Sequence, residues 1–238
     1  MLIAIPSKGR AADVKSLSLV PDAVLFVPAG EAAVYRKKYP NVVPVPDSVR
    51  GITNTRNWIL KNTDDRWVVF VDDDLKKAGW IKLYEHNARH RPLTPEQWMM
   101  EFVRLFEVTE QLKYRLWGVD TAGAPRAVYP YKPFIFQTYV TASCCGIVND
   151  GKTFYDETFP VKEDYELCLR MIKEDGGIVG ARYLYWTNSH WADDGGCKDY
   201  RTMAMEQNCI RRLVAMYPGM IKQVTRGGSG YSISLNFG

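Results

Sequence analysis

Three consecutive carboxylates, Asp72-Asp73-Asp74, directly follow an apolar run at residues 67–71. Continuous apolar runs are typical of strands buried on both faces, and ligands of open α/β sheets bind just beyond the carboxyl ends of such strands. Adjacent carboxylates repel one another unless a cation neutralises them, and oxygen ligands suit Mg²⁺ or Mn²⁺. The pattern therefore predicts a site for a divalent cation and a phosphate-bearing ligand, with a solvated acidic turn as the alternative.

Basic side chains lie in two segments that precede this turn. The first, Ile-Pro-Ser-Lys-Gly-Arg at residues 5–10, follows another apolar run and contains Lys8 and Arg10. The second, Gly-Ile-Thr-Asn-Thr-Arg-Asn at residues 51–57, leads into a helix and contains Arg56. Ammonium and guanidinium groups bind phosphates through charge-assisted hydrogen bonds. We expect these three cations to contact a diphosphate; the alternative for each is an ordinary surface cation.

A second acidic pair, Glu163-Asp164, stands where a later helix is expected to begin. A carboxylate at a helix N-terminus is favoured by the helix dipole, and it is placed to take a proton from an acceptor hydroxyl group. Asp164 is therefore a candidate general base, with Glu163 beside it. The alternative is an acidic pair that only complements the dipole.

The elements that must position these residues alternate along the first half of the chain. Strands are expected at residues 2–5, 23–27, 42–45 and 67–71. Helices are expected at residues 30–39 and 53–60. Pro44 restricts the third strand to a sheet edge or a break. This βαβα order predicts an α/β fold, Rossmann-like, with a mixed and mainly parallel sheet flanked by helices.

The second half is expected to open with a helix at Thr94, where Thr-Pro-Glu-Gln combines an N-cap, a first-turn proline and a capping box. Further strands are expected at residues 139–148 and 178–186, and further helices at residues 163–175 and 200–217. The tail from Arg226 is rich in glycine and serine, and we expect it to be a mobile loop.

Together these motifs resemble the glycosyltransferases of the GT-A fold, over roughly residues 2–200. The resemblance lies in the loop at residues 5–10, the Gly-x-x-x-x-Arg-Asn helix start, the Asp-x-Asp turn and the Glu-Asp-Tyr-x-Leu-x-x-Arg segment at residues 163–170. It implies a transferase for a nucleotide-sugar donor, with UDP favoured and GDP left open as the nucleotide, and with Mn²⁺ or Mg²⁺ as cofactor. It also implies one domain, residues 1–238, with a donor-binding half at 1–75 and an acceptor-side half at 76–238.

The same resemblance implies a role for each site residue. Those expected to bind the donor are Pro6, Ser7, Lys8, Arg10, Arg56, Asp72 and Asp73. Those expected to hold the metal are Asp72, Asp74 and His190. Asp164 is implied as the general base, in a catalytic pair with Glu163. His190 follows the strand expected at residues 178–186, whereas His86 and His90 lie in a charged stretch. A structural histidine is the alternative for His190.

A closer resemblance is to the TET/JBP-associated glycosyltransferases, which occur largely in bacteriophages. It adds the phrases Val-Pro-Val-Pro-Asp at residues 43–47 and Gly-Gly-Cys at residues 195–197, with Tyr200-Arg201 after them. It implies that the acceptor is a 5-hydroxymethylpyrimidine in DNA. Basic clusters such as Lys76-Lys77 and residues 89–91 suit contacts to phosphates, with a solvated face as the alternative for each.

Charge and composition narrow the remaining choices. The formal net charge of +4 permits an anionic partner without requiring one. Five cysteines, an odd number without a Cys-x-x-Cys pair, argue against a disulfide framework and a structural zinc site. No apolar stretch approaches the ~20 residues that span a bilayer, and the first residues do not resemble an export signal. We therefore expect no membrane partner and a cytoplasmic location, in the host if the source is a phage.

Two other functions remain open from the sequence. The first is a GT-A enzyme that glycosylates a glycan, a lipid or a protein, which a membrane anchor or a basic amphipathic helix would favour. The second is a non-catalytic module that binds a nucleotide or a nucleic acid. Loss of the carboxylates would favour that module, whereas Asp72, Asp74 and Asp164 are all present.

Overall fold

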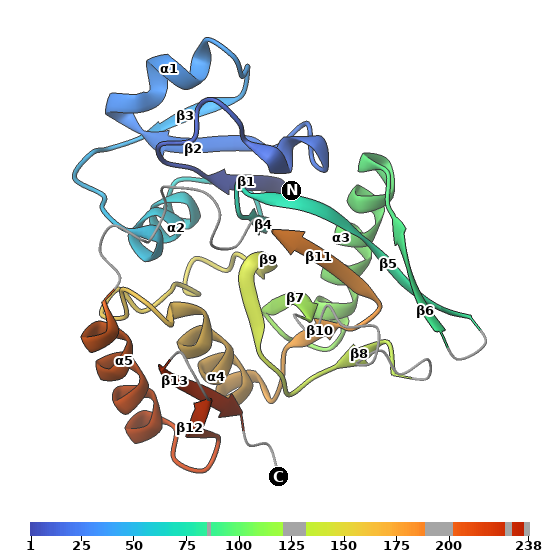
Figure 1. The fold of residues 1–238 in the computed structure, drawn as a ribbon, viewed down its shortest axis with the longest axis vertical. Helices are drawn as coiled ribbons and strands as arrows, with labels where there is room; N and C mark the ends of the chain where they lie inside the picture. The colour runs from blue at the N-terminus through green and yellow to red at the C-terminus, as the bar shows by residue number, and fades with distance from the viewer. Residues whose placement is uncertain (85–86, 121–131, 189–201, 227–229, 236–238) are drawn as a thin grey trace.

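The computed structural model describes residues 1–84, 87–120, 132–188, 202–226 and 230–235, and these are organised around an eight-stranded sheet (Figure 1). The spatial order of its strands is β3-β2-β1-β4-β9-β7-β10-β8. Their bounds are β1 (Leu2–Pro6), β2 (Val24–Pro28), β3 (Val42–Val45), β4 (Trp67–Val71), β7 (Leu116–Asp120), β8 (Phe134–Ile135), β9 (Val140–Val148) and β10 (Val179–Ala181). Strands β1 to β4 pair in parallel, and β9 runs antiparallel to β4 and β7. The expected mixed, mainly parallel sheet is confirmed, with β3 and its proline at one edge.

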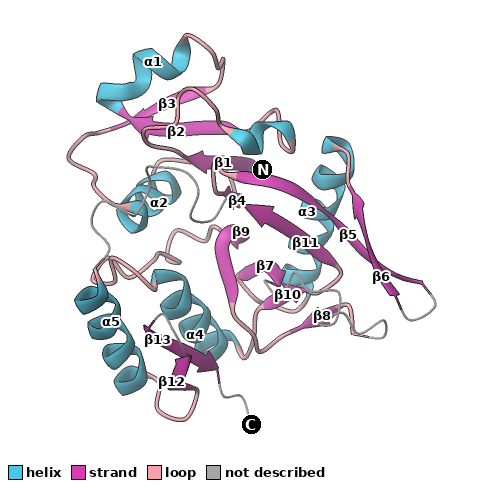
Figure 2. Cartoon of the chain, in the orientation of Figure 1, coloured by secondary structure: helices cyan, strands magenta, loops and turns pink. Residues whose placement is uncertain are grey.

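Helices cover both faces of this sheet because successive side chains of a strand point to opposite sides. On β4, Val68 and Phe70 join the core that includes α2 (Ile52–Lys61) and α4 (Glu163–Asp175). Val69 and Val71 join the core that includes α1 (Ala32–Arg36) and α3 (Pro95–Gln111). Figure 2 shows α2 and α4 on one side of the sheet and α3 on the other.

The helix boundaries follow the local signals in the sequence. The capping box is present: Gln97 N donates to Thr94 Oγ1 at 3.3 Å, and Thr94 N donates to Gln97 Oε1 at 3.0 Å. Helix α4 ends at Gly176, whose φ of 86° is a backbone conformation that glycine adopts without strain. The helix expected at residues 30–39 is shorter, because the 3₁₀ turn η2 (Ala29–Glu31) precedes it and α1 ends at Arg36. Among the described helices, none is both long and apolar enough for a membrane span.

A second, smaller sheet stands beside the main one. It is antiparallel, in the order β11-β5-β6, with β5 (Leu75–Tyr84), β6 (Asn87–Pro92) and β11 (Leu184–Asn188). The expectation of one strand at residues 178–186 was wrong, because a turn at Arg182-Tyr183 separates β10 in the main sheet from β11 in the small one. Apolar runs predict burial, and they do not show that the chain changes sheets in the middle.

The C-terminal part forms a layer against α4. It consists of helix α5 (Met203–Met216) and the antiparallel strands β12 (Ile221–Arg226) and β13 (Gly230–Leu235). The third core joins Leu169 of α4 to Leu213 of α5 and Ile221 of β12. The expectation of a loop from Arg226 was wrong over residues 230–235. The sequence Tyr-Ser-Ile-Ser-Leu at 231–235 alternates apolar and polar residues, a strand signal that outweighs the nearby glycines.

Candidate active site

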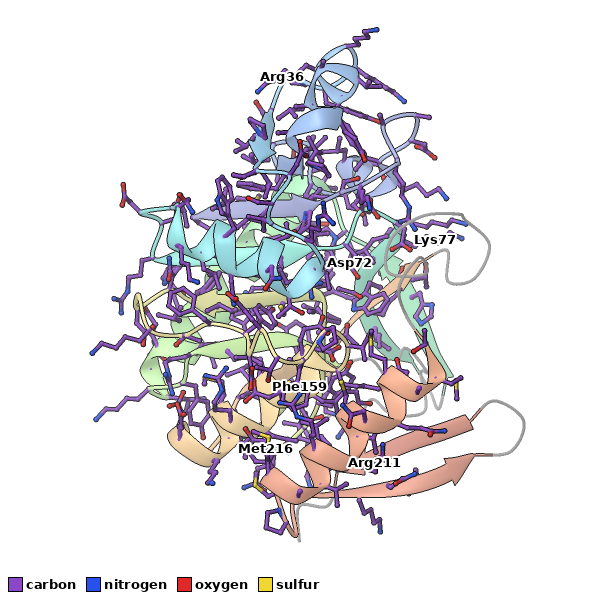
Figure 3. All side chains as sticks on the ribbon, turned by 90° about the vertical axis from the view of Figure 1, so that its left-hand side faces the viewer. Arg36, Asp72, Lys77, Phe159, Arg211 and Met216 are labelled. Carbon is purple, nitrogen blue, oxygen red and sulfur yellow. The ribbon has the colours of Figure 1, made fainter. Side chains whose placement is uncertain are left out.

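The carboxyl ends of β1 and β4 bring two predicted segments together. These strands pair in parallel, with Ala4 opposite Phe70, so the loop after β1 and the turn after β4 leave the sheet at the same edge. Pro6 is the last residue of β1, the loop after it contains Ser7, Lys8 and Arg10, and the turn contains the three aspartates. Figure 3 looks onto the side where Asp72 lies, in the middle of the view between Arg36 of α1 above and Arg211 of α5 below.

Asp73 is held inside this junction. Ser7 Oγ donates to Asp73 Oδ2 at 2.6 Å, and Arg10 Nη1 forms an ion pair with Oδ1. Ser7 Oγ also lies 2.9 Å from the Tyr35 hydroxyl. Burial raises the pKa of Asp73 to about 6, against the lowering effect of Ser7 and Arg10. The loop after β1 therefore contacts the acidic turn directly, through the carboxylate of its middle residue.

The outer two aspartates are more open. The side chain of Asp72 is 32% exposed and that of Asp74 is 16% exposed. Ser143 Oγ, from β9, donates to Asp72 Oδ2 at 2.5 Å, and Arg10 Nη1 lies 3.5 Å from Asp74 Oδ2. The turn backbone is fixed by the buried Ser16, whose hydroxyl donates to the Asp72 carbonyl at 2.5 Å and accepts from Leu75 N at 2.9 Å.

This arrangement fits a divalent cation that shares its coordination with a ligand. Within the described ranges, no three His, Cys, Asp or Glu side chains gather into a complete metal site. Mg²⁺ and Mn²⁺ need only one or two protein carboxylates when substrate phosphates and water complete the shell. Asp72 and Asp74 would supply such carboxylates, although Arg56 and Arg10 lie beside them, while Asp73 is buried against Ser7 and Arg10. His190, the third predicted ligand, lies outside the described residues.

Arg56 joins the donor-side turn to the predicted catalytic pair. Its Nη2 lies 3.1 Å from Asp72 Oδ1 and donates to the Ala142 carbonyl at 3.3 Å. Its Nη1 lies 2.9 Å from Glu163 Oε1. The residue is only 3% exposed, so the alternative of a surface cation was wrong. Direct contact of Arg56 with a diphosphate stays a prediction; in this structure the guanidinium orders two carboxylates from distant segments.

The rest of helix α2 fixes the chain that leads into α4. Thr53 Oγ1 donates to the Phe159 carbonyl at 3.0 Å. Asn57 Nδ2 donates to the Tyr155 carbonyl at 2.9 Å, and Asn57 Oδ1 accepts from Tyr155 N at 2.8 Å. Thr53 and Asn57 are both buried. In the Arg-Asn pair of the sequence motif, Arg56 therefore holds Glu163, and Asn57 holds the chain at Tyr155 that leads into α4.

Asp164 stands in the first turn of α4, next to an aromatic pair. The Tyr139 hydroxyl donates to Asp164 Oδ2, and Tyr165 N donates to Oδ1 at 2.9 Å. The rings of Tyr139 and Tyr165 stack with centroids 3.9 Å apart. Burial raises the pKa of Asp164, although the Tyr139 hydrogen bond lowers it. Burial likewise raises the pKa of Glu163, to about 7. A carboxylate with a raised pKa is a stronger base for a hydroxyl proton.

Several site residues escaped the sequence prediction. Ser16, Ser143 and Tyr139 each donate to one of the acidic residues, and Tyr35 supports Ser7. Serine and tyrosine have no distinctive spacing at these positions, so only the fold identifies them. Of the predicted donor residues, Pro6 and Ser7 are buried, Arg10 is partly buried and Lys8 is exposed at the loop.

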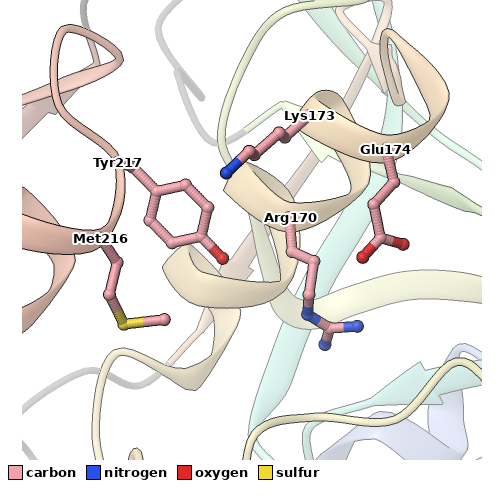
Figure 4. A pocket seen from close by; sticks show the side chains of 5 residues that line it. All are labelled: Arg170, Lys173, Glu174, Met216 and Tyr217. Carbon is pink, nitrogen blue, oxygen red and sulfur yellow. The ribbon is translucent and has the colours of Figure 1, made fainter.

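A surface hollow of about 420 Å³ lies elsewhere, between α4 and α5 (Figure 4). Its lining residues are Arg170, Lys173, Glu174, Met216 and Tyr217. The two cations already interact within the protein, since Arg170 Nε donates to Glu166 Oε1 at 2.9 Å and Lys173 Nζ lies 5.9 Å from the Tyr217 ring centre. None of the predicted catalytic or donor residues lines this hollow.

The chain was compared with models of protein families. The model of the family described as TET-associated glycosyltransferase matches residues 1–196. The search of curated proteins finds no match.

Solved structures with a similar fold are glycosyltransferases of low sequence identity. A mannosyltransferase from Pyrobaculum calidifontis, solved with GDP-Man and Mn²⁺, has a TM-score of 0.57 and 9% identity over 90% of this chain and 63% of its own. Glucosyl-3-phosphoglycerate synthase from Mycobacterium tuberculosis, solved with Mn²⁺ and UDP, has a TM-score of 0.52 and 14% identity over 98% and 85%. The S. aureus TarS fragment with UDP-GlcNAc has a TM-score of 0.51 and 12% identity over 90% and 67%.

These likenesses establish the GT-A fold. The same synthase was also solved with Mg²⁺ and UDP. This chain spans 60% of the length of the TarS fragment in a further crystal structure.

Proposed function

Because the chain belongs to the TET-associated glycosyltransferase family, and is thus a glycosyltransferase, we propose that it transfers a sugar from a UDP-linked donor to the hydroxyl of a 5-hydroxymethylpyrimidine in DNA. The observation that carries the proposal is the Arg56 bridge between Asp72 and Glu163. It brings a candidate donor site and a candidate base to one edge of the sheet. The family match supports the DNA acceptor.

In this proposal the donor binds at the carboxyl ends of β1 and β4. The loop with Pro6, Ser7, Lys8 and Arg10 lies beside the base and ribose, and Lys8 is exposed there to meet phosphate. Asp72 and Asp74 would hold Mn²⁺ or Mg²⁺, with His190 as the third predicted ligand. The cation supplies electrostatic stabilisation of the leaving diphosphate. In these terms residues 1–75 serve the donor and residues 76–238 the acceptor.

The acceptor hydroxyl reacts on the α4 side of the site. Its oxygen forms a bond to the anomeric carbon of the sugar, while the bond from that carbon to the diphosphate oxygen breaks and the nucleoside diphosphate leaves. Asp164 takes the hydroxyl proton, and its raised pKa suits that step. The Tyr139 hydroxyl and Tyr165 N orient the carboxylate. Glu163, paired to Arg56, anchors the start of the helix that carries Asp164.

The test of this function is a mass measurement on DNA. Three duplexes, unmodified, 5-hydroxymethylcytosine-containing and 5-hydroxymethyluracil-containing, are incubated with the protein, Mn²⁺ and a panel of UDP- and GDP-sugars. We expect a mass gain of one sugar on a hydroxymethylated duplex alone. No gain on any duplex, together with transfer to a glycan, lipid or protein acceptor, would contradict the DNA assignment. No turnover of any donor, with nucleotide binding intact, would favour a binding module.

Dependence on a metal has its own test. We expect EDTA to abolish transfer and Mn²⁺ or Mg²⁺ to restore it, because the outer carboxylates are arranged to share a cation with phosphate. Asp74→Ala should lose transfer activity even when Mn²⁺ is present. Asp47→Ala, which removes an exposed aspartate that accepts a hydrogen bond from Gly30 N, is the matched control. Full activity of the Asp74 variant in EDTA would refute the metal role.

A further inference from the structure

Lys162, the residue directly before α4, has a backbone conformation that costs a lysine energy. Its φ of 64° and ψ of 17° lie in the left-handed region, where the Cβ atom of an L-residue crowds a neighbouring carbonyl oxygen. In the described ranges, Lys113, with a φ of 60°, is the other non-glycine residue with a positive φ. Glycine adopts this conformation without strain, as Gly176 does at the far end of the same helix. Strain of this kind persists only where the surrounding contacts maintain it, and it is often found at functional sites.

The start of a helix is also an unfavourable place for a lysine. Serine, threonine, aspartate and asparagine are preferred there, because their side chains accept a hydrogen bond from a free backbone N–H group. The side chain of Lys162 forms no such bond, and its charge stands at the positive end of the helix dipole. Lys113 differs, since it follows the C-terminal end of α3, where a left-handed residue and a positive charge are both favourable. The local backbone gives no reason for a lysine at position 162, so the reason must lie in the contacts of its side chain.

The side chain of Lys162 joins α5 to the tyrosine pair beside the candidate base. Its Nζ lies 3.0 Å from Glu206 Oε2 in the first turn of α5, and the two side chains are only 18% and 12% exposed. The same Nζ lies 5.4 Å from the centre of the Tyr165 ring. That ring stacks on Tyr139 with an angle of 11° between their planes, and the Tyr139 hydroxyl donates to Asp164 Oδ2. The ammonium is thus held by α5 and lies on the ring pair that contacts the base.

The two tyrosines also join two separate cores. Tyr139 packs against the core that includes α2, and Tyr165 packs against the core between α4 and α5, two helices that lie side by side in Figure 1. Burial and the charge of Asp164 raise the pKa of Tyr139 well above its usual value, so its hydroxyl keeps its proton and donates to the carboxylate. The position of the stacked rings therefore fixes the direction of the Asp164 side chain.

Lys162 is one of two cations that act on this carboxylate. Burial raises the pKa of Asp164, whereas the Tyr139 hydrogen bond and the charges of Lys162 and Arg56 lower it. Arg56 is bound to two other carboxylates, and Lys162 is bound to Glu206, so the two cations can be varied separately. The titratable and charged groups that act on Asp164 are Tyr139, Lys162, Arg56, Glu163, Cys145 and Cys168.

We propose that Lys162 is a positioning residue for Asp164: its ammonium, held by Glu206, keeps the Tyr165–Tyr139 pair against the carboxylate and favours the ionised form that accepts the proton. This rests on the proposed function, in which Asp164 is the base. The left-handed backbone is kept at position 162 because a glycine there would lack the ammonium. The C-terminal helix α5 thereby takes part in the reaction through Glu206.

The first test compares pH profiles of kcat/KM for transfer to a hydroxymethylated duplex. Lys162→Met removes the charge and keeps an unbranched side chain, whereas Lys162→Arg keeps the charge. Without the cation the pKa of Asp164 rises, so we expect the acidic limb in Lys162→Met to move up by about 0.5–1 pH unit. We expect kcat on the plateau to fall by roughly 10-fold, less than for loss of the base itself, with UDP affinity retained. The limb of Lys162→Arg should match the wild type; an equal shift in both variants, or in neither, would overturn the role of the charge.

Substitution by glycine separates the backbone from the side chain. Lys113→Gly is the matched control, because it relieves the same strain at an exposed lysine, and it should raise the melting temperature by about 2 °C with the pH profile unchanged. Lys162→Gly relieves the strain before α4 but loses the ammonium, so its acidic limb should move as in Lys162→Met. A Lys162→Gly variant with the kcat and pH profile of the wild type would show that the side chain is dispensable, and would overturn the proposal.

A double-variant cycle tests the contribution of α5. Glu206→Gln should lower kcat several-fold in the wild type and cause no further loss in Lys162→Met, because residues that act through one contact are not additive. Equal losses in both backgrounds would overturn the contribution of Glu206.

The failure of this proposal and of the proposed function can be told apart by a titration that needs no acceptor. The Asp164 carboxyl group is followed by NMR in protein with isotope-labelled aspartate, and its signal is assigned with Asp164→Asn. If no duplex is glycosylated while the midpoint rises in Lys162→Met and not in Lys162→Arg, the proposed acceptor is overturned and Lys162 still positions Asp164. If the wild type glycosylates a hydroxymethylated duplex while Lys162→Met moves neither the midpoint nor the acidic limb, the Lys162 proposal alone is overturned.

Discussion

Replacing Arg56 with methionine removes a buried guanidinium and keeps an unbranched side chain that still fills part of its space. In the wild type this group is paired with Glu163 at 2.9 Å and with Asp72 at 3.1 Å. Asp72 is partly exposed, so water replaces much of what it loses. Glu163 is buried, and without Arg56 its ionised form has no ion-pair partner. The effect of the substitution should therefore depend on the protonation of Glu163.

The size of the expected loss of stability follows from the protonation state of Glu163. Removing one partner of a buried ion pair costs about 3–5 kcal/mol when the remaining charge stays buried. Burial raises the pKa of Glu163 to about 7, so at pH 8 the group is largely ionised in the wild type. We expect Arg56→Met to destabilise the fold by about 3 kcal/mol at pH 8. At pH 5 Glu163 is protonated, so the ion pair that is lost is the one with the partly exposed Asp72, and we expect a loss of about 1 kcal/mol.

Urea unfolding followed by tryptophan fluorescence at both pH values measures this difference. Arg66→Met is the control, since its side chain is 69% exposed in the ion pair with Glu110, and it should cost under about 0.5 kcal/mol at either pH. Adding Glu163→Gln to Arg56→Met should recover about 2 kcal/mol at pH 8, because the buried charge is gone. Equal losses at both pH values, or no recovery in the double variant, would refute the bridge. Unchanged stability with lost UDP affinity would show instead that Arg56 contacts the diphosphate.

Three further predictions concern the acidic pair of α4. Asp164→Asn should lower kcat by about 10²- to 10⁴-fold while UDP affinity is retained, and a collapse of UDP binding would mark Asp164 as structural. Tyr139→Phe removes a hydrogen bond that lowers the pKa of Asp164, so the acidic limb of the pH profile of kcat/KM should move to higher pH; an unmoved limb would exclude Asp164 as the titrating base. Glu163 has a raised pKa in the folded protein, so its contribution to stability is fully present below pH 4.5 and is lost as pH rises to about 7. Glu163→Gln should flatten this loss, worth up to roughly 3 kcal/mol, in unfolding free energies measured from pH 4 to 8; an unchanged slope would contradict the assignment.

The order of strands and helices in the donor half could be predicted because its signals are local. The run at residues 67–71 is apolar throughout, since β4 is buried on both faces of the sheet, and the aspartates end it. The capping box at Thr94 and the glycine at residue 176 mark helix ends within a few residues. These signals depend only on residues that are close together in the sequence, so they can be recognised without knowledge of the fold.

The geometry of the site could not be predicted, because it depends on contacts between distant residues. Arg56 and Glu163 are 107 positions apart, and Ser7 and Asp73 are 66 apart. The pattern Gly-x-x-x-x-Arg-Asn suggests a phosphate contact for its arginine, yet the fold turns that side chain inward to two carboxylates. The split between β10 and β11 has the same origin, since the turn at Arg182 is fixed by a hydrogen bond from its N to the Pro133 carbonyl.

The three consecutive aspartates differ in their partners: Arg56 and Ser143 contact Asp72, Ser7 and Arg10 contact Asp73, and Arg10 also lies near Asp74. Asp73 points into the junction with the loop after β1, where its burial is compensated by Ser7 and Arg10. Burial of Asp73 costs stability when its carboxyl group ionises, as its raised pKa of about 6 indicates, and Ser7 and Arg10 reduce that cost. The side chain of Asp72, held by Arg56 and Ser143, is 32% exposed, and that of Asp74, near Arg10, is 16% exposed. Asp72 is thus the carboxylate of the turn most accessible to a cation shared with a diphosphate, because Asp73 is buried against Ser7 and Arg10, and Asp74 is the second predicted ligand.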